Sequence, residues 1–193
     1  MTAFTYRMGA GSPGDVTRIH PGSIRAFLND ASGQAPLSYF GQAALFDGTH
    51  NAIRAVNNSA DYTGSVKTVS IAGITVRPYP TQDNGSASPY YGAVAYGGGG
   101  PVAGGITDIL AQGSILVTQN QPAGTYAAAS ALGGAVYVRV VAGTIAGWTT
   151  ALPVGGFEAV ADPFSAAYQI IAANAYWNGP ADQFGVAEIT LID

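Results

Sequence analysis

Six stretches of the chain combine β-branched and aromatic residues with small polar ones, and turn residues separate them. They are residues 65–71, 74–76, 114–118, 136–141, 168–171 and 186–192. Valine, isoleucine, threonine and tyrosine fit the pleated surface of a sheet, whereas glycine, proline, asparagine and aspartate initiate turns. The pattern therefore predicts strands that recur at the spacing typical of a β-sandwich or barrel.

Helical periodicity is weak throughout the sequence. Residues 21–30 fit a short helical turn or a strand equally well. Residues 127–132 have a helix-forming composition, but Gly133 follows within two turns, so we interpret them as a loop. We predict an all-β fold, either jelly-roll-like or a related β-sandwich or barrel, because a helix-rich nucleotide-binding fold needs long amphipathic segments.

The loops between the predicted strands are rich in glycine and proline. We predict an N-terminal arm over residues 1–22 and a single β domain over residues 23–193. Extended loops are expected at about residues 77–101 and 119–135. Long loops on a rigid scaffold often carry function, so the 77–101 loop and the arm are the leading candidates for contact with a partner.

Charge is scarce. Only 9% of the 193 residues are charged, against about 25% in typical soluble domains. The net charge is −4, and six of the seven cations lie in residues 1–96, which offers no clustered basic surface for nucleic acid. The chain has no cysteine, so we expect no disulfide. No cationic leader or long apolar run is evident, so we expect no membrane association and synthesis in a cytoplasm.

Motifs that carry chemistry are weak. Residues 9–14 match G-x-G-x-x-G, but the β-branched Val16, Thr17 and Ile19 follow where a dinucleotide site needs a helix, so we predict a turn. The two histidines, His20 and His50, stand 30 positions apart. We predict no catalytic residue, cofactor or metal and no enzymatic activity; an enzyme would require the histidines or a carboxylate pair to converge in a pocket.

Aromatic residues are more informative. Tyr79, Tyr90 and Tyr91 accompany the glycine-rich loop, and Trp177 precedes Asn178-Gly179-Pro180. Such side chains either cap the end of a β-sandwich or, when exposed beside glycine and serine, supply contact area at interfaces and in carbohydrate-binding loops.

Four phrases in order resemble the structural cement, or capsid decoration, proteins of tailed bacteriophages. They are GSPGDVTR at 11–18, GITVRPYPTQ at 73–82, GGFEA at 155–159 and NAYWNGPAD at 174–182. The resemblance implies a compact β domain that binds the outer capsid surface of the virion and stabilises contacts between major capsid protein subunits. It also implies self-association, as a dimer rather than a trimer, and synthesis in the host bacterial cytoplasm.

The expected capsid or oligomer interface combines cations and aromatics. It comprises Arg7, Arg18, Arg25, Arg77, Tyr79, Tyr90, Tyr91 and Trp177. By hypothesis the arginines pair with carboxylates of the capsid lattice, while weakly charged faces avoid the cost of burying ions. The alternative is a carbohydrate-binding β-sandwich or virion adhesin that uses Tyr90, Tyr91, Trp148 or Trp177 as stacking platforms.

Overall fold

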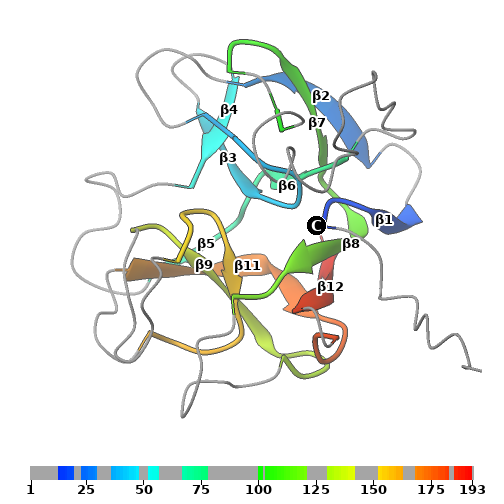
Figure 1. Cartoon of the computed structure of the whole chain (residues 1–193), viewed down its shortest axis with the longest axis vertical. Helices are drawn as coiled ribbons and strands as arrows, with labels where there is room; N and C mark the ends of the chain where they lie inside the picture. Colours follow the sequence, from blue (N-terminus) through cyan, green and yellow to red (C-terminus); the bar gives the residue numbers. More distant parts are fainter. Residues whose placement is uncertain are drawn as a thin grey trace, which may run out of the picture.

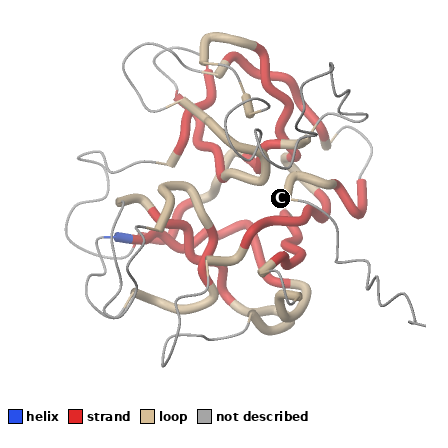
Figure 2. Tube along the Cα trace, viewed as in Figure 1, coloured by secondary structure: helices blue, strands red, loops and turns tan. Residues whose placement is uncertain are grey.

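Strands and loops make up nearly all of the described chain (Figure 2). In the computed structural model the described residues are 13–19, 23–29, 36–47, 52–56, 67–77, 100–101, 103–120, 130–141, 152–162, 168–182 and 185–192. The prediction of an all-β fold is confirmed.

Twelve strands follow one another in these ranges. They are β1 (Val16–Ile19), β2 (Ile24–Leu28), β3 (Ala43–Asp47), β4 (Ala52–Ala55), β5 (Lys67–Val69), β6 (Gly73–Thr75), β7 (Ile106–Leu110), β8 (Gly113–Thr118), β9 (Ala135–Arg139), β10 (Phe157–Glu158), β11 (Gln169–Trp177) and β12 (Val186–Leu191).

The strands form two sheets in a sandwich-like arrangement (Figure 1). The larger sheet has the order β1-β8-β12-β11-β9-β10, with β5 added in parallel to β11. The smaller sheet has the order β2-β7-β6-β3-β4, and all its neighbours are antiparallel. The chain passes from the smaller to the larger sheet between β7 and β8, which only two residues separate.

Both sheets curl, and in each an isolated bridge links strands that lie far apart in the sheet order. In the larger sheet an isolated bridge joins Gln119, just after β8, to Phe157 of β10. In the smaller sheet a bridge joins Asn29, just after β2, to Ile53 of β4. Each sheet therefore has a barrel-like curvature, which places the end of β2 beside the β3–β4 hairpin.

One hydrophobic core joins the facing surfaces of the two sheets. The smaller sheet contributes Leu45, Ile74 and Leu110, and the larger sheet contributes residues such as Val138 and Ile170. A second cluster fills the inside of the curled smaller sheet and consists of Leu37, Ala44, Ile53, Ala55, Ala72 and Ile109. The centre of the smaller sheet is thus buried on both faces.

Gly14 joins the two sheets through its backbone. Its N–H donates to the carbonyl of Leu116 in β8 at 2.7 Å, and its carbonyl accepts from the N–H of Arg77, after β6, at 3.0 Å. Gly14 has a φ of +88°, and a Cβ there would lie 2.9 Å from the Cβ of Phe40. The position therefore needs glycine for both its conformation and its space.

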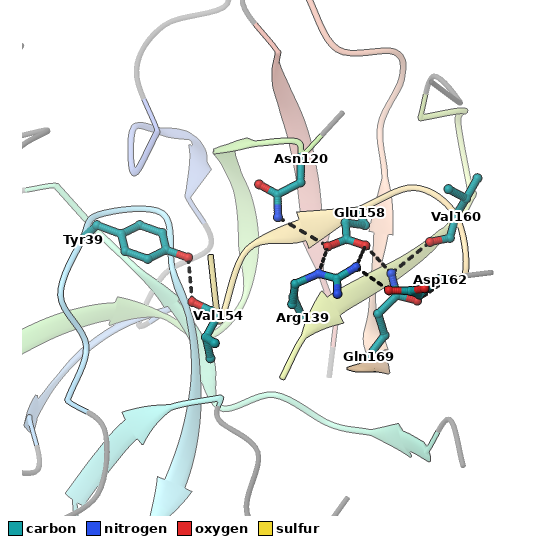
Figure 3. A network of polar contacts seen from close by, with 8 residues as sticks. All are labelled: Tyr39, Asn120, Arg139, Val154, Glu158, Val160, Asp162 and Gln169. Carbon is teal, nitrogen blue, oxygen red and sulfur yellow. Dashed lines mark hydrogen bonds and ion pairs between the residues drawn. The ribbon is translucent and has the colours of Figure 1, made fainter. Parts of the chain in front are cut away.

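A second polar contact ties the segment before β3 to the turn before β10. The hydroxyl of Tyr39 donates to the carbonyl of Val154 at 3.0 Å (Figure 3). The side chain of Gln42 donates to the same carbonyl at 3.3 Å and accepts from the N–H of Ser38 at 2.8 Å. Burial raises the pKa of Tyr39 well above its ordinary value.

The strand predictions can now be compared with the fold. All six predicted stretches contain strands, namely β5, β6, β8, β9, β11 and β12, and residues 24–28 of the ambiguous segment form β2. Residues 16–19, which the sequence placed in the arm, form β1 of the larger sheet. The G-x-G-x-x-G motif ends in a turn at 13–14 that leads into a strand, as predicted. Residues 130–134 are loop and turn, and 127–129 lie outside the described residues.

We predict that Gly14→Ala lowers the free energy of unfolding by about 2–4 kcal/mol, because it adds a clash to the cost of a left-handed alanine. Gly133→Ala is the matched control: φ is +74° there, but nothing lies within 4 Å of the added Cβ. The control should lose only about 1–2 kcal/mol. Urea unfolding of both variants measures the difference, and equal losses would contradict a steric requirement at Gly14.

We predict that the contribution of Tyr39 to stability falls as the pH rises. The pKa of Tyr39 is raised by burial, so the folded state favours the neutral phenol. Above about pH 10, tyrosine in the unfolded chain ionises and the folded chain loses stability. Tyr39→Phe should cost about 1 kcal/mol at pH 8 through the lost hydrogen bond. Urea unfolding at increasing pH should show this cost shrinking; a constant cost would contradict the prediction.

Candidate interaction surface

An exposed apolar surface lies on β2 and β7, on the side of the smaller sheet that carries the core residue Leu110. Antiparallel pairing sets Ile24 opposite Leu110, Ala26 opposite Asp108 and Leu28 opposite Ile106. Directly opposite residues share a face of a sheet. Leu110 is buried in the core between the sheets, but the other members are exposed, with Ile106 at 72%. We call the exposed group, which is Ile24, Ala26, Leu28, Ile106 and Asp108, the β2–β7 face.

An aromatic pair lies on the other side of the smaller sheet. The rings of Phe27 and Phe46 meet edge to face with centroids 5.4 Å apart. Phe46 pairs with Ile53, which bridges Asn29, so the curl of the smaller sheet brings β3 beside the end of β2. Phe46 is 57% exposed. Phe27 packs against the cluster inside the smaller sheet, and Phe46 pairs with Ile53 of that cluster, so both rings belong to the side of the sheet opposite the β2–β7 face.

A further exposed apolar side chain lies on the larger sheet. Leu132 is 78% exposed in the turn before β9. The turn is closed by a hydrogen bond from the N–H of Gly134 to the carbonyl of Ala131 at 2.8 Å, and the N–H of Gly133 donates to the carbonyl of Trp177 at 2.8 Å. Single exposed leucines are common, so this site lacks the extent of the β2–β7 face.

The predicted interface cations have different surroundings. Arg18 on β1 and Arg25 on β2 are exposed. Arg77 is partly buried and forms an ion pair with Asp15 at 2.6 Å, so its guanidinium already has a partner within the chain. Arg7 lies outside the described residues.

Trp177 is a core residue and not a surface aromatic. Its side chain is 0% exposed, and its indole N–H donates to the carbonyl of Ala135 at 3.0 Å. The ring is therefore unavailable for a partner or a sugar, which corrects both roles considered for it from the sequence. Tyr79, Tyr90, Tyr91 and Trp148 lie outside the described residues.

A buried polar network lies on the larger sheet, on the side of β9 and β10 that faces away from the core (Figure 3). Arg139 binds both oxygens of Glu158, through Nε at 2.5 Å and Nη2 at 2.7 Å. Nη2 also donates to Asp162 at 2.9 Å. Gln169 donates to Glu158 and to the carbonyl of Val160, and its Oε1 accepts from the N–H of Asp162 at 2.6 Å.

This network compensates the burial of its charges. Burial opposes the charged guanidinium of Arg139, but the hydrogen bonds and negative charges of Glu158 and Asp162 outweigh it and raise the pKa of Arg139 above its ordinary value. Glu158 is 2% exposed and accepts from Arg139 at both oxygens. The arrangement is that of a structural ion pair.

The two glutamates of the chain, Glu158 and Glu188, are not brought together. Glu158 is on β10 and Glu188 is on β12, and β11 and β9 lie between these strands in the sheet. Glu188 instead accepts a hydrogen bond from Thr17 of β1. Within the described ranges, no group of three or more histidine, aspartate or glutamate side chains is placed to hold a metal ion. No helix in these ranges is long and apolar enough to span a membrane.

Comparison with models of protein families gives a match over nearly the whole chain. The sequence model described as "Structural cement protein (E217 gp24/Pam3 gp6)" matches residues 1–192. The chain belongs to the phage structural cement protein family. The resemblance noted in the sequence is thereby confirmed, and the family assigns this cement protein a structural, capsid-stabilising role in the virion. No curated protein matches the sequence.

Strand β7, which carries part of the candidate surface, was not predicted, although the sequence of the cement protein indicates it weakly. Residues 106–110 read ITDIL between Gly104-Gly105 and Gly113, which is typical of a strand bounded by turns. Its exposure could not be read from the pattern, because Ile109 and Leu110 are buried on opposite faces while Ile106 is exposed.

We predict that Glu158→Gln in the cement protein lowers the free energy of unfolding by about 3 kcal/mol, since it removes one partner of a buried arginine. Glu188→Gln is the control, because Glu188 is only half-buried and its partner Thr17 is exposed. The control should cost about 1 kcal/mol. The midpoints of urea unfolding test this, and equal costs would argue that the Arg139 network adds no stability.

Proposed function

We propose that this protein binds the outer surface of a phage capsid and stabilises contacts between major capsid protein subunits, without enzymatic activity. The observation that carries the proposal is the family match over residues 1–192. The protein is synthesised in the host bacterial cytoplasm and acts on the capsid surface. It also associates with itself, as a dimer rather than a trimer.

The β2–β7 face is the proposed capsid contact. A capsid-binding protein needs a surface whose burial provides free energy, and each square ångström of apolar surface removed from water contributes about 25 cal/mol. Ile106 and Leu28 are 72% and 41% exposed, so a partner can cover much of both side chains. Among the described residues, no comparable group of exposed apolar side chains lies on the larger sheet.

The exposed cations Arg18 and Arg25 supply a second, weaker contribution. Arg18 lies on β1 and Arg25 lies on β2, which are edge strands of the two sheets. Capsid carboxylates are their proposed partners. Exposed ion pairs contribute about 0–1 kcal/mol each, so they guide the approach to the capsid more than they hold the complex. Repeated copies on one lattice convert modest single contacts into stable attachment.

The direct test mixes purified protein with undecorated capsids of its phage. We expect binding at a fixed ratio of copies to capsid subunits and a higher temperature of capsid disruption. A folded protein that does not bind, or that binds without changing the heat resistance of the capsids, would contradict the proposed function.

We predict that Ile106→Asp weakens capsid binding by about tenfold or more, because it places a charge where apolar contact is proposed. Leu132→Asp is the matched control, since Leu132 is equally exposed but lies on the other sheet. The control should bind like the unmodified protein. Sedimentation of capsid-bound protein gives both affinities, and equal loss in the two variants would remove the β2–β7 face from the contact.

A further inference from the structure

The β2–β7 face carries one charge among its apolar side chains. Asp108 lies between Ile106 and Leu110 on β7 and opposite Ala26 on β2. It is exposed, and no hydrogen bond or ion pair of its carboxylate with another described residue is present. Arg25, the nearest cation along β2, belongs to the opposite side of the sheet, because it pairs with Ile109. Among the described residues, the carboxylate of Asp108 is therefore uncompensated on an apolar surface.

An uncompensated carboxylate in such a place restricts what can cover the face. Burying it under an apolar surface without a partner costs several kcal/mol, which would cancel the gain from covering Ile106 and Leu28. A second copy that packs face to face about a two-fold axis through the centre of the face, where Asp108 lies, would bring two Asp108 carboxylates together, which adds repulsion to desolvation. The face thus rejects both a plain apolar surface and its own copy.

We propose that Asp108 selects the partner of the β2–β7 face, which is an apolar surface of the capsid protein that carries a lysine or arginine opposite Asp108. This inference rests on the proposed function. The same carboxylate keeps free copies from associating through this face before they reach the capsid. It acts as the charged residues on exposed sheet surfaces do, by making the wrong contact costly.

The polarity of this contact is the reverse of the one expected from the sequence. The sequence hypothesis pairs arginines of the cement protein with capsid carboxylates. The contact proposed from the structure pairs a carboxylate of the cement protein with a capsid cation. The two can coexist because Arg18 lies on β1 of the larger sheet and Arg25 lies on the side of β2 opposite the β2–β7 face. Self-association of the intact protein must then use a different surface.

The first experiment measures capsid affinity for the unmodified protein, Asp108→Asn and Asp108→Arg. We expect Asp108→Arg to weaken binding by about tenfold or more and Asp108→Asn to weaken it less, because only the former adds repulsion. Leu132→Arg, which adds a positive charge at an exposed site of the other sheet, controls for overall charge and should bind normally. Normal binding by Asp108→Arg would overturn the inference and leave the proposed function intact, whereas failure of the unmodified protein to bind would overturn both.

The second experiment needs no capsid. Asp108→Leu makes the β2–β7 face continuously apolar, so analytical ultracentrifugation should show association beyond that of the unmodified protein as concentration rises. Thr68→Leu is the control, since it adds a leucine at an exposed position of β5 in the larger sheet. Asp108→Leu with the mass of the unmodified protein at every concentration would contradict a role of Asp108 in keeping copies apart. Circular dichroism verifies that each variant is folded.

Discussion

The larger and smaller sheets bury their facing sides in one hydrophobic core, and the rest of the structure depends on this contact. Leu45, Ile74 and Leu110 of the smaller sheet pack in the same cluster as Val138 and Ile170 of the larger one. Because the smaller sheet also encloses a second cluster, β6 and the first three residues of β3 have no solvent-facing side. Charged residues are excluded from such segments, which accounts in part for the low charge of the chain.

Buried amides replace regular pairing where the strands end. The side chain of Asn29 donates to the carbonyl of Leu37 at 3.0 Å and accepts from its N–H at 2.8 Å. Asn174 holds the peptide of Ile71 in the same way, with both distances at 3.0 Å. Together with Gln42 and the Arg139 network, these side chains satisfy backbone groups that the irregular segments would otherwise leave unpaired. Polar residues thus stabilise the interior, while much of the surface stays neutral.

The cement role makes sense of a surface that would be a liability in an isolated protein. On the side of β7 that carries Leu110, the side chains change from buried Leu110 at one end of the strand to exposed Ile106 at the other. An exposed sheet face of this kind invites unwanted association unless a charge opposes it. Asp108 supplies a charge at the centre of the face. In the proposed function, attraction to the capsid and repulsion between free copies would therefore arise from adjacent residues.

Local pattern was sufficient for the strands rich in valine and isoleucine, for the turn at Gly14 and for the family, since ordered phrases identify it without knowledge of contacts. It missed β3, whose AALFD sequence lacks β-branched residues and whose first three side chains are buried on both sides, so that no alternation appears. Nor could it place Trp177 in the core, pair Arg77 with Asp15 or bury Arg139. The sequence by itself determined the fold class and the family, because both depend on residue type and order. Which side chains are exposed depends on how two curled sheets pack, and only the tertiary structure decided that Ile106 and Asp108 are exposed while Trp177 is buried.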